Sequence, residues 1–434
     1  MGVADVAMAG HASAQDLAGV SLGVSVWHIV MISLMGVLMA VNPIVSQHVG
    51  AGQFGLVPRV VRQALWKALG VSLIAMLAAN AAALVFARLN VEPAVRVLAR
   101  DFVFVIGFGL PAFCCYRVLY GYSASVNQTK PMMVISLLAL LVNIAVNWLL
   151  VFGHLGFPRL GGAGVRLVHA VLCVVQPDRH GVVDAPRARV SSHAAVRAVR
   201  DAALARDPNL APNRFADRGD LFRREQRLHL IALLVADFGT VQVGAHQIAL
   251  NFASLVFMAP MSLGIALLTR VGQALGAGDA ASARFRAWVG VGMALAVATI
   301  SALLIALLNR RIAAAYNNDL AVAALASQLL IYAAVFQLSD ATQVSTSSAI
   351  RAYKVTRSPM VIHLSAFWGL SLPLGCVLGL APAWLPWRPV PAMAAQGFWI
   401  ALVVGLTIAA LALTWLLHRL SLRHVREQGL LAAR

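Results

Sequence analysis

The chain has 434 residues, of which 60% are hydrophobic and 12% are charged, about half the charged fraction of an ordinary soluble domain. This composition excludes a water-soluble globular protein. The net charge of +18 does not indicate nucleic-acid binding, because 19 of the 50 charged residues lie between residues 166 and 229. Much of the remaining positive excess lies between apolar segments, as in a membrane protein.

Long apolar runs follow one another along most of the chain, and each is long enough to cross about 30 Å of hydrocarbon as a helix. None shows the period-2 alternation of a barrel strand, so the sequence predicts an all-α polytopic membrane protein. A shorter run, Leu228–Phe238, is interpreted as part of a further span. The nine long runs are Val20–Val45, Ala64–Ala87, Phe102–Ser125, Met132–Phe152, Val241–Leu268, Trp288–Leu308, Ala321–Ile350, Met360–Leu380 and Gly397–Leu417.

The short loops between these runs carry unequal numbers of lysines and arginines. When alternate loops are assigned to alternate sides of the membrane, one side holds fourteen basic residues and the other holds seven. Because cytoplasmic loops carry the excess, we expect the basic side, which includes the C-terminus, to be cytoplasmic. The predicted location is the inner (cell) membrane of a bacterium.

Two sequence motifs recur at nearly one spacing. Gln47-His48-Val49-Gly50-Ala51-Gly52 aligns with Gln273-Ala274-Leu275-Gly276-Ala277-Gly278, 226 residues later, and Lys130-Pro131-Met132 aligns with Ser358-Pro359-Met360, 228 residues later. Such a repeat is typical of a transporter built from two related lobes. The alternative is that Gly-Ala-Gly and X-Pro recur by chance, because glycine and proline are common in turns and loops.

The sequence therefore predicts three regions. Residues 1–165 form an N-lobe and residues 230–434 form a C-lobe, while residues 166–229 fit neither. This middle segment follows no helical or strand period, and four prolines interrupt it. It is interpreted as irregular or disordered, with three alternatives open: a soluble loop between lobes, a linker, or a stretch translated out of frame.

The motifs resemble those of the multidrug and toxic compound extrusion (MATE) family, in particular its bacterial branch named after norfloxacin export. Besides the two repeated motifs, the segments that carry this resemblance are Met1-Gly2-Val3-Ala4-Asp5-Val6-Ala7-Met8-Ala9-Gly10, Asn42-Pro43-Ile44-Val45-Ser46-Gln47, Val243-Gly244-Ala245-His246-Gln247-Ile248-Ala249-Leu250-Asn251, Pro260-Met261-Ser262 and Asp340-Ala341-Thr342-Gln343-Val344. The resemblance implies two pseudo-symmetric lobes of six transmembrane helices, and exchange of Na⁺ or H⁺ for organic cations. Relative to that plan, we expect the first helix to be truncated and the sixth and seventh to be disrupted.

Asp340 is the acidic residue that lies well inside a long apolar run. A carboxylate at that depth is costly unless it faces water or a cation, so it is a functional candidate by default. Its oxygen ligands suit Na⁺, and a desolvated carboxylate also binds H⁺. The alternative is a buried partner for Arg351 or another base. The resemblance makes Asp340 the cation-coupling aspartate of the C-lobe, with Phe336 where family members have a tyrosine.

The other candidates follow from helical spacing and from the resemblance. The resemblance makes Asp5 the cation or proton site of the N-lobe and places Asn143 and Asn147 in the same pocket. These two asparagines are four residues apart, as are Gln247 and Asn251, so each pair shares one helix face. Gln343 follows Asp340 by three residues, and we expect it, Gln247 and Asn251 to line a substrate cavity. The alternative for the two asparagines is hydrogen bonding between helices.

These observations favour a cation-coupled multidrug efflux antiporter that exports small organic cations by alternating access. The chain has no P-loop and no motif of a hydrolase or metal enzyme, so we expect no enzymatic activity. We also expect no structural metal, no cofactor besides the coupling ion, no nucleic-acid partner, contact with the lipid bilayer, and a monomer. Two alternatives remain: a lipid-linked oligosaccharide flippase of the same superfamily, and an inactive product of a frameshifted transporter gene.

Overall fold

The computed structural model describes residues 38–83, 107–152, 240–316, 319–380 and 393–432, with short pieces between residues 30 and 37 and between 97 and 105. Every regular element in these ranges is a helix. The predicted all-α class is therefore confirmed. The middle segment, residues 166–229, lies outside the described residues.

The chain divides into two compact units. The first comprises Met1–Val45 and Phe54–Leu221, and the second comprises Ser46–Gln53 and Phe222–Arg434. The described helices that lie in the first unit are α4 (Val57–Ala83), α6 (Leu110–Ser125) and α7 (Lys130–Phe152), with α4 packed against α6. Helix α3 (Val41–Gly50) begins in the first unit, and its last residues belong with the second.

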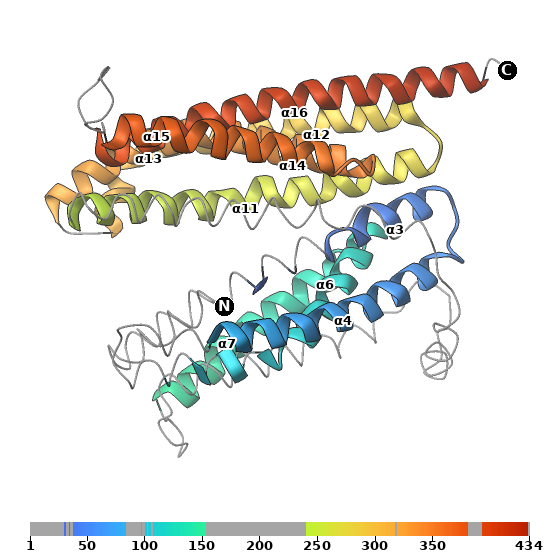
Figure 1. The fold of residues 1–434 in the computed structure, drawn as a ribbon, viewed down its shortest axis with the longest axis horizontal. Coiled ribbons are helices and arrows are strands. Elements are labelled where there is room, and N and C mark those ends of the chain that lie inside the picture. The colour runs from blue at the N-terminus through green and yellow to red at the C-terminus, as the bar shows by residue number, and fades with distance from the viewer. Residues whose placement is uncertain are drawn as a thin grey trace. The chain divides into compact units, whose positions relative to one another are not determined.

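The second unit is a bundle of long helices (Figure 1). Helix α13 is central because three of the other long helices pack against it. Helix α13 contacts α11, α12 and α16, while α14, η5 and α15 follow one another along α16. The bounds are α11 (Thr240–Gly276), α12 (Ala280–Tyr316), α13 (Leu320–Ala352), α14 (Arg357–Leu364), η5 (Ser365–Ser371), α15 (Leu372–Leu380) and α16 (Ala394–Ala432).

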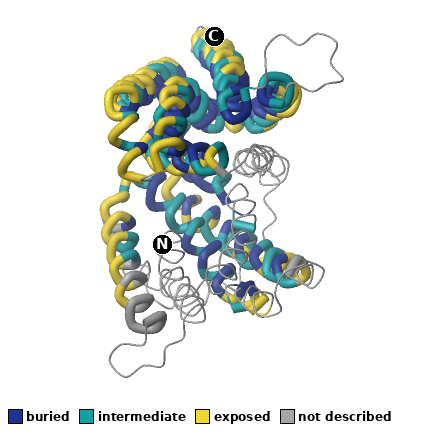
Figure 2. Tube along the Cα trace, turned by 90° about the vertical axis from the view of Figure 1, so that its left-hand side faces the viewer, coloured by how far each residue is buried: buried dark blue, intermediate teal, exposed yellow. Residues whose placement is uncertain are grey.

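Two apolar clusters hold this bundle together. One surrounds Trp399, Phe398 and Phe367 and draws residues from α11, α12, α13 and α16. The other surrounds Leu413 and Leu417, toward the C-terminal end of α16. Burial follows the helix sides that face their neighbours, and the outer sides are exposed (Figure 2).

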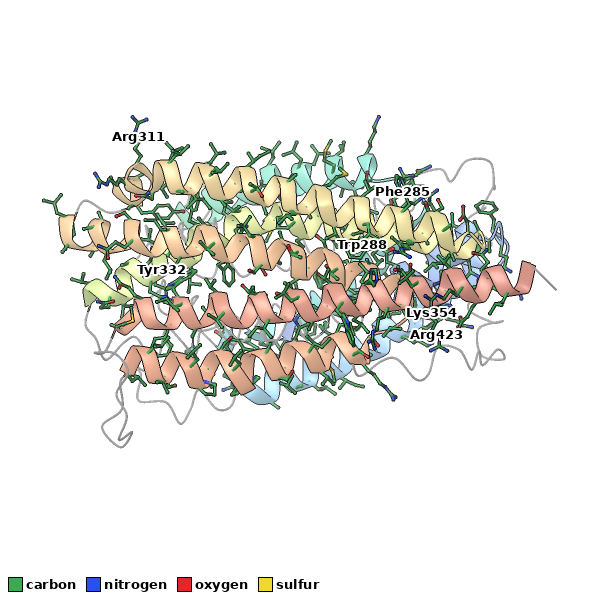
Figure 3. All side chains as sticks on the ribbon, turned by 90° about the horizontal axis from the view of Figure 1, so that it is seen from above. Phe285, Trp288, Arg311, Tyr332, Lys354 and Arg423 are labelled. Atoms are coloured by element: carbon green, nitrogen blue, oxygen red, sulfur yellow. The ribbon has the colours of Figure 1, made fainter. Side chains whose placement is uncertain are left out.

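The exposed sides of the long helices are largely apolar, as lipid contact requires. Helix α12, for example, exposes Ile300, Leu303, Leu304 and Leu307, which share one helix face. Six helices in the described part of the chain are long and apolar enough to cross a membrane. Charged side chains lie toward the ends of the second unit, with Arg311 at one end and Lys354 and Arg423 toward the other (Figure 3).

The predicted span Met360–Leu380 corresponds to a helical segment that begins at Arg357 and contains three helical pieces. Its middle piece, η5, is a seven-residue π-helix between two α-helices. A wide turn of this kind is rare and frequently marks a functional region. On α16, a Cβ at Gly405 would meet the Ser371 hydroxyl at 1.7 Å, so the π-helix packs against a position that only glycine allows.

The repeated motifs have the same backbone structure in both halves of the sequence. After α3 and again after α11, three successive backbone N–H groups donate to carbonyls of the last turn at 2.9–3.1 Å. In each case the terminating residue is a glycine with positive φ, 69° at Gly52 and 74° at Gly278. This conformation favours glycine and is typical of helix C-termini. A second pair of matching turns has φ 61° at both Asn127 and Lys354, 227 positions apart.

Within the second unit, the end of α3 crosses the end of α11 at very short range. A Cβ at Gly50 would lie 1.9 Å from the Gln273 carbonyl oxygen, and a Cβ at Gly276 would lie 1.9 Å from the Gln47 carbonyl oxygen. The contact is thus reciprocal between the two copies of the motif. The Gln47 amide also donates to the Ala352 carbonyl at 2.8 Å and so joins α3 to the end of α13.

Candidate functional site

Asp340 is fully buried on α13, with none of its surface exposed. The helix begins at an N-cap, Asp319, whose carboxylate accepts from the backbone N–H groups of Ala321 and Val322. From there Asp340 is about 31 Å along the helix, and it is about 18 Å before the last helical residue, Ala352, at 1.5 Å per residue. The carboxylate therefore lies deep inside the helix bundle, far from either helix end.

Gln343 lies one turn beyond Asp340 and reaches a neighbouring helix. Its amide donates to Nδ1 of His363 on α14 at 3.1 Å. His363 is buried and is the seventh residue of α14, two residues before the π-helix begins. The structure thus joins a predicted site residue to a titratable side chain that the sequence analysis did not single out.

An aromatic group lies on the other side of Asp340 along the helix. Phe336, four residues before Asp340, contacts the edge of the Trp399 ring with centroids 5.9 Å apart. Trp399 in turn donates from its indole nitrogen to Nδ1 of His246 on α11 at 3.2 Å. Both Trp399 and His246 are fully enclosed. Acceptance at Nδ1 fixes the ring orientation of His246, as expected of a packed histidine.

Gln337 is a further polar residue of this interior that sequence reasoning missed. It lies three residues before Asp340, and 1% of its surface is exposed. Neither its amide oxygen nor its amide nitrogen has a hydrogen-bond partner among the described residues. A buried amide in this condition costs about 1–3 kcal/mol, so it needs an explanation. The available signal was its i, i+3 spacing to Asp340 within an apolar run.

Gln247 and Asn251 are exposed on α11, in agreement with their predicted common face. Ser254 and Ser262 continue the same side of the helix and are also exposed. Asn251 accepts a hydrogen bond from the Tyr316 hydroxyl at 3.0 Å. Helix α11 therefore exposes several polar side chains on a side that also exposes Met258, although its composition is that of a membrane span.

The candidates of the first unit are less fully described. Asn143 and Asn147 lie on α7, as predicted, but their side chains are outside the described residues, and so is Asp5. The structure therefore brings Asp340 and Gln343 into one region with His363, and it does not test the predicted pocket around Asp5. Within the described residues, no group of three or more His, Cys, Asp or Glu side chains is placed to hold a metal ion.

Comparison with known proteins agrees with this architecture. The family described as MatE matches residues 1–149 and 228–377. The protein named "Probable multidrug resistance protein NorM" of Chromobacterium violaceum is 40% identical over 446 residues, covering 98% of this chain and 91% of that protein. The "Multidrug resistance protein MdtK" of Edwardsiella ictaluri is 36% identical and covers 95% and 89%.

Solved structures of MATE transporters have the same fold as this chain. The eukaryotic MATE transporter AtDTX14 superimposes with a TM-score of 0.81 at 16% identity, covering 98% of this chain and 94% of that one. The MATE transporter NorM-NG, solved in a complex that includes a monobody, gives a TM-score of 0.81 at 29% identity, covering 99% and 92%.

The fold and the apolar helices thus define a polytopic membrane protein with the architecture of MATE transporters. The chain belongs to the MatE family and is NorM-like, which confirms the resemblance read from its motifs. The family match breaks over residues 150–227, a range that contains most of the segment set apart by the sequence analysis.

Proposed function

We propose that the protein is a cation-coupled multidrug efflux antiporter of the bacterial inner membrane. The observation that carries this proposal is the complete burial of Asp340 in the centre of a membrane-spanning helix bundle. A carboxylate in such a place is costly unless it is protonated or paired with a cation. One negative charge then serves two positively charged species in turn, Na⁺ or H⁺ on one side and an organic cation on the other.

The names of the relatives support the substrate class. Two proteins with 40% and 37% identity are named probable multidrug resistance proteins, and a third with 36% identity is named a multidrug resistance protein. The exposed amides of Gln247 and Asn251 on α11 support a water-filled substrate path, because amides are costly against lipid. The excess of basic residues in alternate loops supports a cytoplasmic C-terminus.

Exchange follows from competition for the charge of Asp340. When the coupling ion occupies the carboxylate, the site no longer attracts a cationic drug, and loss of the ion restores that attraction. Alternating access of two lobes would open the site to one side of the membrane at a time. Asp5, Asn143 and Asn147 are proposed to form the corresponding pocket of the first lobe, and Gln343 to line the second.

The test is ethidium efflux from a drug-sensitive bacterium that expresses each variant at an equal membrane level. We expect Asp340→Asn to abolish ion-dependent efflux, because the amide has the same shape and no charge. The matched control is Asp319→Asn, which removes a carboxylate from the same helix while keeping a good N-cap. Efflux by the Asp340→Asn variant at the wild-type rate would refute the proposal.

A further inference from the structure

Three side-chain donors are buried at one end of the second unit without a hydrogen-bond partner among the described residues. They are the indole N–H of Trp288 on α12 and the hydroxyls of Tyr353 and Thr356, in the turn that joins α13 to α14. Tyr353 has 7% of its surface exposed. Because burial of an unpaired donor is costly, an acceptor from outside the chain would stabilise this end of the bundle.

Helices α12 and α16 run antiparallel at this end. The Ala280 N–H donates to Oε1 of Gln428 at 2.7 Å, and two turns further along α12 the Trp288 ring contacts the His418 ring with centroids 6.1 Å apart. Arg284 is midway between these two contacts. It is therefore level with the part of α16 that lies between the same two contacts.

The Tyr353 ring reaches this level from the end of α13. It contacts the edge of the His424 ring on α16, with centroids 4.9 Å apart. Nδ1 of His424 donates to the Leu420 carbonyl at 3.0 Å, which fixes the ring that Tyr353 packs against. The Arg284 guanidinium acts on the Tyr353 hydroxyl and opposes the rise in its pKa that burial causes. A cation and an unpaired hydroxyl donor therefore lie close together.

The charge at this end of the bundle favours an anion. Arg284 forms no ion pair with a described residue, and the acidic side chains of the adjoining helix ends are already engaged. Asp279 accepts from the Ser282 N–H at 2.8 Å, and Glu427 pairs with Arg423 at 2.7 Å. A guanidinium beside a hydroxyl donor is suited to the oxygens of a phosphate group.

Exposed aromatic side chains place this end of the helices at the membrane boundary. Phe285 is 70% exposed and Trp415 is 56% exposed, and the Arg419 guanidinium lies 3.9 Å from the centre of the Trp415 ring. Figure 3 shows Phe285 and Trp288 toward the same end of the second unit as Lys354. Aromatic rings and basic side chains are typical of the headgroup region, where the phosphates of phospholipids lie.

An apolar stripe leads away from Arg284 along the outside of α12. Phe285, Val289 and Met293 follow one another at intervals of four residues, and all three are exposed. A phosphate at Arg284 can therefore continue into an acyl chain on this stripe, which favours a lipid over free phosphate. A zwitterionic headgroup would bring its own cation toward Arg284, so the charge favours an anionic lipid.

We propose that Arg284 and Tyr353 bind the phosphate of an anionic phospholipid at this end of the second unit. The guanidinium donates to the phosphate and neutralises its charge, and the Tyr353 hydroxyl donates to a second oxygen. Trp288 is one turn from Arg284, and Thr356 is three residues from Tyr353, so each offers a further donor to the headgroup. The bound lipid joins α12 to the turn between α13 and α14. This inference goes beyond drug transport and does not depend on it.

The experiment titrates the purified, delipidated protein with dioctanoylphosphatidylglycerol, a short-chain anionic phospholipid, and follows the melting temperature. The lipid concentrations that give an equal rise over the lipid-free protein are compared, because they scale with the dissociation constant. We expect Arg284→Gln to raise this concentration about tenfold or more, and Tyr353→Phe to raise it about three- to tenfold, since each removes a hydrogen bond to a charged acceptor.

Arg286→Gln is the matched control. Arg286 carries the same charge two residues later on α12, is exposed, and donates to the Arg270 carbonyl at 3.3 Å. We expect this variant to require the same lipid concentration as the wild type. If Arg286→Gln and Arg284→Gln weakened the lipid effect equally, the lipid would be attracted by net charge alone, and the proposed site would be overturned.

The lipid-free protein gives a second readout. Removal of a buried hydroxyl that has no partner is neutral or stabilising, so Tyr353→Phe should melt at or above the wild-type temperature without lipid and should gain fewer degrees from the lipid. An equal gain from the lipid in Tyr353→Phe and the wild type would refute the role of the hydroxyl. If Arg284→Gln fails to insert, Arg284→Lys, which keeps the charge and loses the planar fork, should also show weakened lipid binding.

Two comparisons identify the ligand. Dioctanoylphosphatidylcholine has a zwitterionic headgroup and should require a higher concentration for the same rise in melting temperature; an equal effect would refute the anionic headgroup. Inorganic phosphate at the concentration of the lipid should leave the melting temperature unchanged. A rise as large as that with the lipid, lost in Arg284→Gln, would show that the site takes free phosphate and would overturn the lipid assignment.

Discussion

The reciprocal crossing of α3 and α11 predicts a large effect from adding a single methyl group. In Gly276→Ala the new Cβ would lie 1.9 Å from the Gln47 carbonyl oxygen, whereas ordinary contacts begin near 3.4 Å. The two helix ends must therefore separate by about 1.5 Å, because the obstacle is a backbone atom and not a movable side chain. Overpacking of this kind costs about 1–3 kcal/mol, offset by up to about 1 kcal/mol from the higher helix propensity of alanine.

The assay is thermal unfolding of the purified protein in detergent, followed by intrinsic fluorescence. We expect Gly276→Ala to lower the melting temperature by about 2–6 °C. The control is Gly292→Ala in the interior of α12, where a new Cβ meets nothing within 4 Å and the melting temperature should stay the same or rise. Because one separation relieves both contacts, Gly50→Ala combined with Gly276→Ala should cost less than the sum of the single changes. Equal melting temperatures for Gly276→Ala and Gly292→Ala would refute the reasoning.

Two further predictions concern the ends of α13. Asp319→Ala removes the carboxylate that accepts from Ala321 N–H at 2.8 Å, so we expect a loss of about 1 kcal/mol in unfolding experiments, while Asp319→Asn should melt like the wild type. At the other end, burial raises the pKa of Tyr353 from 10.0 to about 12, and Arg284 opposes the shift. Since the folded state binds this proton more tightly, the associated stability is fully present below pH 10 and is lost as the pH rises through about 12. Ultraviolet absorbance should show a late-titrating phenol that Tyr353→Phe removes; a titration near pH 10 would contradict the assigned burial.

Hydropathy predicted the helices of the second unit well. It predicted the residues at which a helix begins or ends only where a capping residue marks the position. The predicted run Ala321–Ile350 agrees closely with α13, because Asp319 caps its start. The run Trp288–Leu308 underestimates α12, which extends at both ends through arginines whose long stems remain compatible with the membrane boundary. The π-helix between α14 and α15 could not be predicted, since it depends on the packing of Ser371 against α16.

The sequence could predict a site residue where burying its side chain costs free energy that only a function explains. A carboxylate inside an apolar run is conspicuous, and Asp340 is indeed completely buried. A glutamine in the same run carries no charge, and its i, i+3 spacing to Asp340 alone does not distinguish Gln337 from an amide that pairs with a neighbour. Its significance appears only when the surrounding helices show that no described neighbour bonds to it. The contact of His363 with Gln343 could likewise not be predicted from the sequence, because the two residues are 20 positions apart and lie on different helices.

The matching turns at Asn127 and Lys354 also allow the two halves of the sequence to be aligned residue by residue. Counted back over the same 227 positions, Asp340 corresponds to Phe113, a buried residue of α6. Helix α6 contains one charged residue, and it is a base, Arg117. Helix α13 thus carries a buried carboxylate at the position where α6 has a phenyl ring, so in this pair of helices the attraction for cations belongs to α13 alone.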